Sequence, residues 1–556
     1  MNSLGKIKIT YSDGTVQEVG EGTTLLELSK EAQQNYKSTI VAAKVNNAVK
    51  DLNFELKEDA LVEFLDLTTD DGFRIYQRSL SFLLIKAVGE IFPEARVTIE
   101  HSISKGLYCE LHNKDPITEK DVRKIENHMR ELVEQDITFH KDTVPLNEAI
   151  KLFEKEGQMD KVRLLKYREK PTITIYSCGW LRDYFYGYMV PSTGFLKKFE
   201  LKYYMPGFIL RYPDKFNPEA IPEYKEQPKL FSVFREAEKW ARILEVTDVG
   251  ALNDQIAAGH ADDLIRVSEA FHEKKIAHFA DLITKERDQI RIILIAGPSS
   301  SGKTTFAQRL SVQLRVNGVK PISISLDDYF VSRDKTPLDE KGEPDFEALE
   351  AIELDLFNEH LTKLIQGAEV ELPTFNFVTG QREYRGRKIR IKRDQPIIIE
   401  GIHGLNEKLT AAIPRGSKFK IYVSALTQLN IDSHNRIPTT DARIIRRIVR
   451  DSQFRSHDAL KTIKIWPKVR RGEERNIFPF QEDADVMFNS HLVYELAVLK
   501  RYAEPLLQAI DAQQPEYSEA KRLLKFLSFF LPMEDFEVPN NSIIREFIGN
   551  SSFCRE

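Results

Sequence analysis

The sequence contains, over positions 297–305, the stretch Gly297-Pro298-Ser299-Ser300-Ser301-Gly302-Lys303-Thr304-Thr305. An apolar run over 292–296 precedes it, and Phe306, Leu310 and Leu314 follow at helical spacing. A strand, a glycine-rich loop and a helix with the spacing GxxxxGK[ST] are typical of a loop that binds a phosphate chain. We therefore predict a nucleoside triphosphate site at this loop.

Each part of the loop has a physical task. Glycines allow a tight turn whose backbone N–H groups point at the phosphates, and the following helix adds the positive end of its dipole. Lys303 is expected to place its charge on the outer phosphates, and Thr304 to ligate Mg²⁺. ATP and Mg²⁺ are therefore the predicted cofactors. The residues expected to contact the nucleotide are Gly297, Ser299, Ser300, Ser301, Gly302, Lys303, Thr304 and Thr305.

The bulk properties indicate an ordinary globular protein of several domains. A chain of 556 residues is too long for one core, and 42% hydrophobic with 30% charged residues is a usual composition. The net charge of −5 gives no global sign of nucleic-acid binding. Three cysteines far apart argue against a disulfide framework or a structural zinc site, so a reducing cytoplasmic location fits. No signal peptide and no apolar run of about 18 residues is found, so no membrane span is predicted.

Residues 1–66 are predicted to form a β-grasp. Alternating apolar residues, a turn at Asp13-Gly14 and a capping box at Thr24-Leu25-Leu26-Glu27 indicate a hairpin followed by a short helix. The stretch resembles the TGS domain of threonyl-tRNA synthetases through Tyr11-Ser12-Asp13-Gly14 and Lys44-Val45-Asn46. A binding or docking role is expected rather than a catalytic one.

Residues 67–225 resemble the second additional domain of the same synthetases, an α+β domain that hydrolyses mischarged tRNA. The segments Gly72–Ser79 and Leu181–Pro191 carry this resemblance. The chain departs from the family at its four ligand positions, because the histidine and cysteine places hold Arg78, Phe82, Phe185 and Met189. Metal binding and water activation need imidazole or thiolate groups. We therefore predict that the fold is kept without the editing chemistry, and that this region offers a contact for RNA.

Three further segments complete the predicted organisation. Residues 226–288 are a helical linker, residues 289–510 form the nucleotide-binding domain, and residues 511–556 form a helical tail. The tail is expected to pack on the nucleotide-binding domain and to carry no chemistry. The front domains are followed by this domain in place of a synthetase catalytic core, which argues against aminoacylation.

Two carboxylates are expected beside the phosphate loop, because each follows a predicted strand of the same open sheet. Asp327 comes directly after the strand 321–326 and could accept a proton from a substrate hydroxyl. A helix cap or turn is the alternative for this residue. Glu400 ends the apolar strand 396–399 and could hold Mg²⁺ directly or through water.

Two later segments leave alternatives open. The aromatics of 372–384 could stack on a flat ring or fill the core of a hairpin, and the basic residues of 385–393 could face solvent or contact tRNA. The arginines of 443–455 lie on a predicted helix. In a phosphotransferase they would close as a lid over the transferred phosphoryl group, and otherwise they form a basic surface.

Taken in order over roughly 290–495, these motifs resemble the uridine kinase branch of the phosphoribulokinase/uridine kinase family. The resemblance implies that Asp327 is the catalytic base, with Lys303 and the lid arginines assisting. It places Phe330 beside the sugar and two aromatics against the base. The lid arginines are Arg447, Arg450 and Arg455, and the stacking aromatics are Phe375 and Phe377.

The chain also departs from this family. Gly380 stands at the place of a base-contacting histidine, Asn376 at that of an aspartate, and His457 at that of the last lid arginine. The segment Ser424–Ala442 is longer than usual. The phosphoryl-transfer part therefore matches better than the part that would read a pyrimidine.

The sequence thus predicts a multidomain α/β protein: an N-terminal β-grasp, an α+β synthetase-like domain and a parallel-sheet P-loop domain. The predicted activity is an ATP-dependent kinase of a small molecule, with the 5′-OH of a nucleoside as acceptor. The alternatives are a kinase of another alcohol, such as a sugar phosphate or vitamin precursor, and an RNA-binding regulator with an ATP switch. The sequence leaves room for a homo-oligomer.

Overall fold

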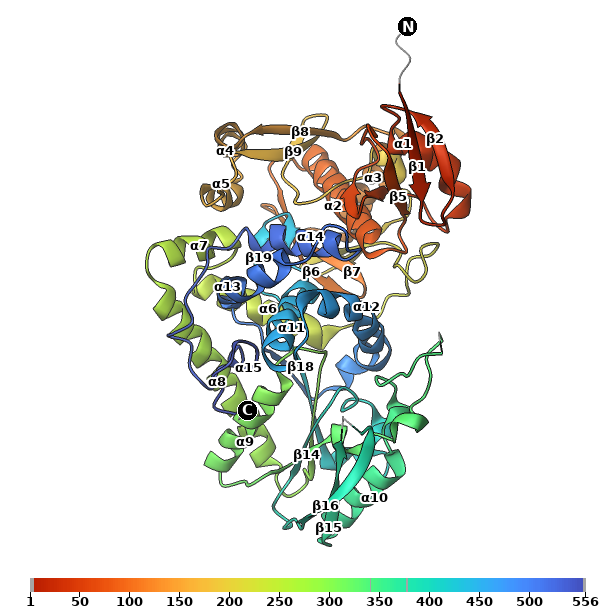
Figure 1. Cartoon of the computed structure of the whole chain (residues 1–556). Coiled ribbons are helices and arrows are strands. Elements are labelled where there is room, and N and C mark those ends of the chain that lie inside the picture. Colours follow the sequence, from red (N-terminus) through yellow and green to blue (C-terminus); the bar gives the residue numbers. More distant parts are fainter. Residues whose placement is uncertain (1–4, 341, 377–378, 554–556) are drawn as a thin grey trace.

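The computed structural model describes residues 5–340, 342–376 and 379–553. The synthetase-like part lies at one end of an elongated molecule and the sheet of the nucleotide-binding domain at the other (Figure 1). None of the helices within these described ranges has the length and apolar character needed to cross a membrane.

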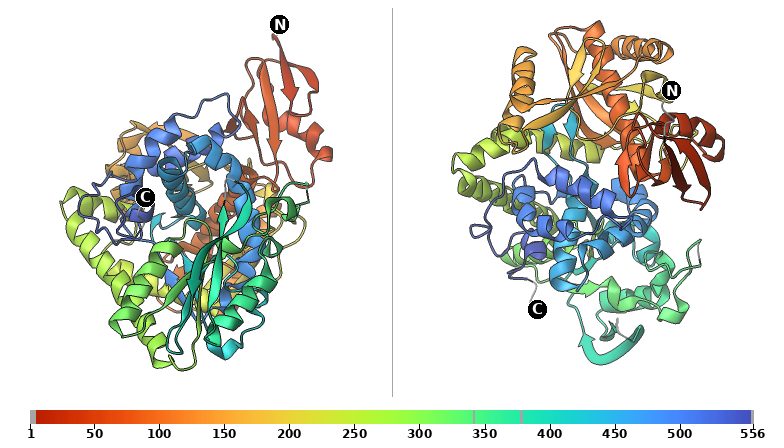
Figure 2. Two further views of the ribbon diagram at one scale, coloured as in Figure 1. Left: turned by 60° about the horizontal axis from the view of Figure 1, so that its bottom comes forward. Right: turned by 45° about the horizontal axis from the view of Figure 1, so that its top comes forward.

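The first unit is a five-stranded sheet in the order β2-β1-β5-β3-β4, with β1 and β5 parallel. Figure 2 shows it as a separate lobe at the side of the molecule. The predicted capping box is present, since Thr24 accepts from the Glu27 N–H and the Glu27 side chain accepts from the Thr24 N–H. The elements are β1 (Lys6–Tyr11), β2 (Val16–Gly20), α1 (Leu25–Ala32), β3 (Ala42–Val45), β4 (Ala48–Lys50) and β5 (Ala60–Leu65).

The second unit packs a long helix against two antiparallel sheets, β11-β12-β7-β6 and β10-β9-β8. Its helices are α2 (Asp70–Ile91), α3 (Glu119–Glu134), α4 (Leu146–Lys155) and α5 (Met159–Lys166). Its strands are β6 (Arg96–Ile103), β7 (Gly106–His112), β8 (His140–Pro145), β9 (Thr172–Cys178), β10 (Leu181–Asp183), β11 (Glu200–Tyr204) and β12 (Gly207–Arg211).

The four positions that hold ligands in synthetase editing domains lie in or beside the apolar core of this unit. The ring of Phe82 on α2 lies 5.7 Å from that of Phe185, measured between centroids, and Met189 is buried nearby. Arg78 donates a hydrogen bond of 2.6 Å to the Tyr188 carbonyl. These positions therefore present hydrocarbon and one guanidinium group, where a metal site would need imidazole or thiolate ligands.

Three helices connect this unit to the nucleotide-binding domain. They are α6 (Pro228–Ile243), α7 (Val249–Ala257) and α8 (Ala261–Lys285). The apolar face of α8 includes Ile276, Phe279 and Ile283, and it packs along α9 (Lys303–Val316), the helix that follows the phosphate loop. The segment is thus part of the packed body rather than an extended spacer.

The nucleotide-binding domain is built on a fully parallel sheet in the order β14-β17-β13-β18-β21. Ile293 and Ile295 of β13 face the core that contains α8 and α9, whereas Ile292 and Leu294 face the core that contains α10 (Leu354–Ile365). Burial on both faces explains the unbroken apolar strands and confirms the predicted fold class. The strands are β13 (Ile292–Ala296), β14 (Ile322–Ser325), β17 (Ile397–Glu400), β18 (Lys418–Ser424) and β21 (Val486–Asn489).

Four more helices belong to the C-terminal half. They are α11 (Thr439–Phe454), α12 (Ala459–Asn476), α13 (Glu495–Gln508) and α14 (Tyr517–Leu527). A fifth, short helix, α15 (Arg545–Ile548), comes near the end of the chain and lies against α11. In Figure 1 this short helix is drawn close to α8 and α9, and Glu546 in it bonds Thr305 of α9.

Two hairpins extend from the sheet. The first, β15 (Val370–Asn376) with β16 (Gln381–Ile389), lies at the far end of the molecule beside α10 (Figure 1). The second, β19 (Asn430–Asp432) with β20 (Asn435–Arg436), occupies the long segment before α11. It docks on the synthetase-like unit, because Ile99 donates its N–H to the Ser433 carbonyl at 2.9 Å.

Candidate active site

The loop 297–302 connects β13 to α9, as the sequence predicts. Gly302 has a positive φ of 81°, the conformation that favours glycine. Gly297 is required for another reason, since a Cβ there would lie 1.9 Å from the Val423 carbonyl oxygen of β18. Both glycines are therefore explained by the course of the backbone around the loop.

Thr304 and Glu400, the predicted metal ligands, lie in contact. The Thr304 hydroxyl donates to Glu400 Oε1 at 3.0 Å, because β17 runs beside β13 and ends level with the start of α9. Burial raises the pKa of Glu400 to about 7, with Lys303 opposing this. A desolvated carboxylate next to a hydroxyl is a set of hard oxygen donors, which is what Mg²⁺ prefers. The two residues fit the ion that the sequence predicts.

Lys303, the lysine of the loop, is influenced by Glu400 and by two further carboxylates. Its ammonium donates to the Pro298 carbonyl at 3.1 Å, within the loop. Burial lowers the pKa of Lys303, while Glu400, Glu546 and Glu473 act in the opposite direction. The charge therefore sits in a pocket of carboxylates at the place where phosphates are expected.

Asp327 lies at the carboxyl end of β14, beside β17, in a short turn of 3₁₀-helix over Leu326–Tyr329. Its outer face is open to solvent, yet the surrounding protein desolvates it enough to raise its pKa, against the effect of Lys303. Its neighbour Asp328 accepts the N–H of Phe375 at 3.4 Å, so it ties the turn to β15. Of the two aspartates, Asp327 is the one available to a substrate hydroxyl.

The predicted acceptor aromatics are only partly described. The rings of Phe330 and Phe375 meet edge to face, with centroids 5.7 Å apart. Phe377 lies outside the described residues. Gly380, at the place of the family's histidine, has its open side filled by Arg333, whose Cβ is 2.8 Å from where a Gly380 Cβ would stand. Arg333 therefore occupies the space beside Gly380.

The arginines of α11 divide into two groups. Arg443 and Arg446 are buried and paired with Glu473 and Glu495, and they also bond the carbonyls of Ser299 and Ser300. Through these hydrogen bonds the two arginines fix the backbone of the loop. Arg443, one of the arginines expected to form a lid or a basic surface, is instead paired with Glu473 and bonds the Ser299 carbonyl.

The other arginines of this region gather around the fully buried carboxylate of Asp451. The nitrogen-to-oxygen distances are 3.1 Å from Arg447, 2.7 Å from Arg450 and 3.7 Å from Arg455. Arg447 also donates to the Ser299 hydroxyl at 2.6 Å, and the charge of Arg455 opposes the rise in the pKa of Asp327 that burial causes. The structure therefore brings all three predicted lid residues to one side of the loop.

Two acidic residues at the loop have no motif in the sequence. Glu473 on α12 accepts the N–H of Ser299 at 2.9 Å. Glu546 on α15 accepts both the N–H and the hydroxyl of Thr305, at 3.1 and 2.9 Å. The tail packs on this domain as expected, and at Glu546 it also reaches the start of α9. A single glutamate among apolar tail residues gives no local signal of such a contact.

Comparison with known proteins finds relatives for both halves. Residues 292–496 match the model of the Phosphoribulokinase / Uridine kinase family. The N-terminal region matches threonine–tRNA ligases, at 35% identity over 196 residues in Desulforamulus reducens and 33% over 196 in Acetivibrio thermocellus. Those matches cover 35% of this chain and 31% of each ligase. A ligase of Citrifermentans bemidjiense is 28% identical over 264 residues, which is 46% of this chain and 41% of that protein. The chain thus spans less than half the length of these relatives.

Two solved structures are also similar. A possible uridine kinase from Bacillus stearothermophilus is 21% identical, with a TM-score of 0.25, over 38% of this chain and 96% of that one. A putative fructose transport system kinase from Silicibacter sp. TM1040 is 14% identical, with a TM-score of 0.27, over 38% of this chain and 98% of that one. The family match over 292–496 confirms the predicted resemblance: a kinase-type P-loop domain follows a region similar to threonyl-tRNA synthetase.

Proposed function

We propose that the chain is an ATP- and Mg²⁺-dependent kinase that transfers the γ-phosphoryl group to a hydroxyl of a small molecule, with a nucleoside 5′-OH as the first acceptor. The observation that carries this proposal is the contact of Thr304 with Glu400 beside Lys303, at the same sheet edge as Asp327. An open parallel sheet binds its ligands at this edge. Family membership of residues 292–496 supports the reaction class.

In this mechanism each side chain has one task. Thr304 and Glu400 would hold Mg²⁺, which neutralises charge on the phosphates when bound. Asp327 takes the proton of the acceptor hydroxyl as the phosphoryl group departs. Lys303 and the three arginines around Asp451 stabilise the negative charge of the transferred group, provided that the arginines turn from Asp451 towards it.

The acceptor is tested by measuring ADP release and product mass with Mg-ATP and a panel of acceptors. The panel contains uridine, cytidine, adenosine, ribose 5-phosphate and a vitamin-type alcohol. Turnover that depends on a nucleoside supports the first acceptor. If none of these alcohols is phosphorylated, the proposal of a small-molecule kinase is rejected.

One observation favours a second candidate, a kinase of an acidic acceptor such as a sugar phosphate. Arg333 fills the side of Gly380 where the related family has a histidine, and Arg382 lies on the neighbouring strand β16. Guanidinium groups match phosphate better than they match an uncharged pyrimidine edge. Preferred turnover of ribose 5-phosphate over uridine would select this candidate.

A third candidate is not an enzyme of small molecules but a regulator that binds RNA and uses ATP as a switch. It rests on the similarity of the N-terminal region to threonine–tRNA ligases. It predicts a gel shift with tRNA at low salt that weakens as salt is raised, because phosphate contacts release counterions. Failure to shift tRNA at low salt would remove it.

Glu400→Gln is expected to raise the Mg²⁺ concentration that gives half-maximal ATP turnover by about ten- to a hundredfold. The change keeps the volume of the side chain but removes a charged oxygen donor. The matched control is Glu407→Gln, beyond β17, whose carboxylate pairs with Lys418 and Lys420. An unchanged Mg²⁺ requirement in Glu400→Gln would show that the metal is held elsewhere.

A further inference from the structure

A cavity of about 1120 Å³ lies between the synthetase-like unit and the nucleotide-binding domain. Helix α2 and Tyr186 form one wall, while hairpin β19–β20 and α11 form the other. The far end of the cavity reaches Pro298 of the phosphate loop. Its volume is slightly larger than that of typical small-molecule sites, which is roughly 300–1,000 Å³.

The charges around Tyr186 do not balance. Arg74 pairs with Asp71 and Glu519, and Arg522 pairs with Asp441 and Glu519. Asp71, Asp441 and Glu519 are therefore all paired with Arg74 or Arg522. Arg78 and Arg436 line the same cavity and are left over.

Among the residues that the structure describes, neither of these two guanidinium groups has an acidic partner. Within the same residues, Arg78 donates only to the Tyr188 carbonyl, and the Nε of Arg436 is buried without a hydrogen bond. Across the described ranges of the chain, no carboxylate lies within 4.0 Å of either group. Burial lowers the pKa of both, as expected for charges that have lost water and found no counter-charge. A bound oxyanion would supply the missing partner.

We propose that this cavity binds a small phosphate-bearing molecule, with its phosphate on Arg78 and Arg436. The planar fork of arginine matches phosphate oxygens with two parallel hydrogen bonds. The rings of Tyr186 and Tyr212 line the cavity beside these groups and suit the sugar or ring of a phosphate ester. Because Arg443 of α11 also lines the cavity and bonds Ser299, the ligand would touch the support of the phosphate loop.

The test is isothermal titration with inorganic phosphate, ribose 5-phosphate and uridine monophosphate. It uses the full chain with Lys303→Ala, so that binding at the phosphate loop is weakened. Binding of at least one probe, lost at least about tenfold in Arg436→Met and in Arg78→Met, is expected. The control is Arg123→Met, whose side chain is 75% exposed on α3.

The three probes separate the sources of the phosphate group. Equal binding of all three indicates a site for the phosphate alone, and preference for an ester indicates a metabolite. Absence of binding, or binding that survives Arg436→Met with unchanged affinity, overturns the proposal. Circular dichroism of each variant shows whether a loss of binding reflects unfolding.

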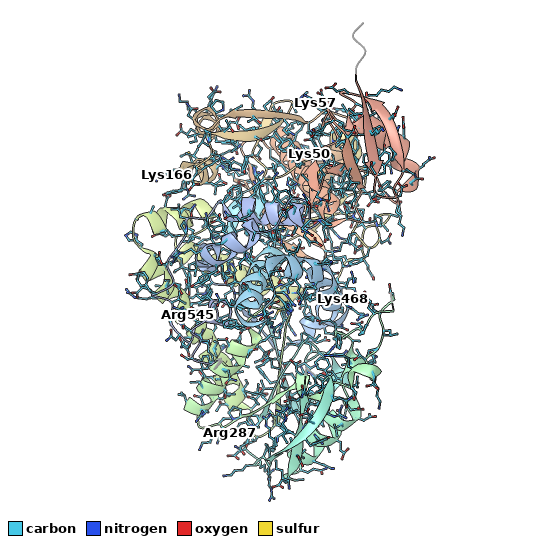
Figure 3. The ribbon with its side chains drawn as sticks, viewed as in Figure 1. Lys50, Lys57, Lys166, Arg287, Lys468 and Arg545 are labelled. Carbon is cyan, nitrogen blue, oxygen red and sulfur yellow. The ribbon has the colours of Figure 1, made fainter. Side chains whose placement is uncertain are left out.

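A second, independent observation concerns the end of the chain. Residues 543–548, which include helix α15, contact the phosphate loop and the start of α9, with Ile543, Ile544 and Phe547 fully buried. Arg545, labelled in Figure 3, fixes the segment by ion-pairing with Asp535 at 2.8 Å and by bonding the Val538 carbonyl. The segment is therefore a folded part of the site.

Glu546 accepts a hydrogen bond from the Thr305 N–H, a donor that a bound nucleotide would use. Its carboxylate accepts the N–H and hydroxyl of Thr305, in the first turn of α9. The N–H groups of this turn have no partner within the helix, and in phosphate loops they bind phosphate oxygens. A carboxylate and a phosphate cannot share this place, because both are acceptors and both are negative.

Two contacts press the same segment against the loop. Ile543 Cγ2 lies 2.5 Å from where a Cβ of Gly302 would be. The Phe547 ring lies 5.0 Å from the guanidinium of Arg446, which in turn bonds the Ser300 carbonyl. The geometry points to residues 543–547 as an autoinhibitory segment that ATP must displace. This inference deepens the proposed function, since it concerns the regulation of the same site.

Glu546→Gln tests it by removing the charge while keeping the shape. The affinity for a fluorescent ATP analogue is expected to rise at least about tenfold. Hydrogen exchange at 543–549 is expected to increase when wild-type protein is saturated with ATP. The control is Glu537→Gln, which lies before the segment in the C-terminal tail and whose partner is the surface residue Arg266.

Unchanged or weaker ATP binding in Glu546→Gln, or unchanged exchange of the segment on ATP binding, overturns the inference. These measurements need no acceptor. ATP that displaces the segment without any alcohol being phosphorylated would therefore reject the kinase proposal and keep the autoinhibitory segment. ATP that never binds would reject both.

Discussion

Asp327→Asn is expected to lower kcat for phosphoryl transfer by about 10²–10⁴-fold, the usual contribution of a general base. The amide keeps the size of the side chain but cannot take the proton of the acceptor hydroxyl. Asp327 lies at the end of β14 and outside the loop, so the affinity for ATP should change little. Steady-state turnover and equilibrium ATP binding, measured on the same preparation, separate the two effects.

The matched control for this change is Asp334→Asn, an exposed aspartate in the next short helical turn. It should leave kcat within about twofold of wild type, since surface substitutions away from a site usually have small effects. If Asp327→Asn turned over at the wild-type rate, another group would be the base. The assignment of Asp327 would then be wrong, even if ATP were still bound.

Lys161→Met is expected to destabilise the joint between the two halves by about 3–5 kcal/mol. Lys161 is 1% exposed, and its ammonium lies 2.9 Å from Asp183 and 3.6 Å from Asp432. His434 of hairpin β19–β20 also bonds Asp183. Removing the ammonium leaves two buried carboxylates without their cation, which is far more costly than losing an exposed pair.

Urea unfolding followed by tryptophan fluorescence checks this expectation. The control is Lys166→Met on the same helix, whose side chain is 64% exposed and pairs with Asp254 at 3.2 Å. Exposed pairs contribute about 0–1 kcal/mol, so the control should unfold nearly as wild type does. Equal unfolding midpoints for the two variants would mean that the buried cluster does not hold the halves together.

Local patterns were sufficient to predict the elements that carry the phosphate chemistry. The run 292–296 and the loop after it predict β13, the loop and α9, because strand, turn and helix are adjacent in sequence. Glu400 bonds Thr304 and Asp327 follows β14, as expected when the carboxyl ends of parallel strands meet at one edge of a sheet. A hairpin, one of the alternatives open for 372–384, is present as β15 and β16.

Long-range contacts could not be predicted in this way. The extra length of Ser424–Ala442 is visible in the sequence, but its docking through Ser433 and His434 depends on residues about 250 to 330 positions away. Arg443 has the spacing of a lid arginine, but in the structure it pairs with Glu473 and bonds the Ser299 carbonyl. Glu546 reaches Thr305 from 241 positions away, and no local pattern reports such a distance.

The central claim is that the loop 297–305, Glu400 and Asp327 form one phosphotransferase site. It is tested most directly by incubating the chain with γ-labelled ATP, Mg²⁺ and each acceptor of the panel, and following the label. We expect label in one acceptor with wild-type protein and a strong loss of that label in Asp327→Asn and Lys303→Ala. Label that appears only as inorganic phosphate, whatever alcohol is present, would contradict it.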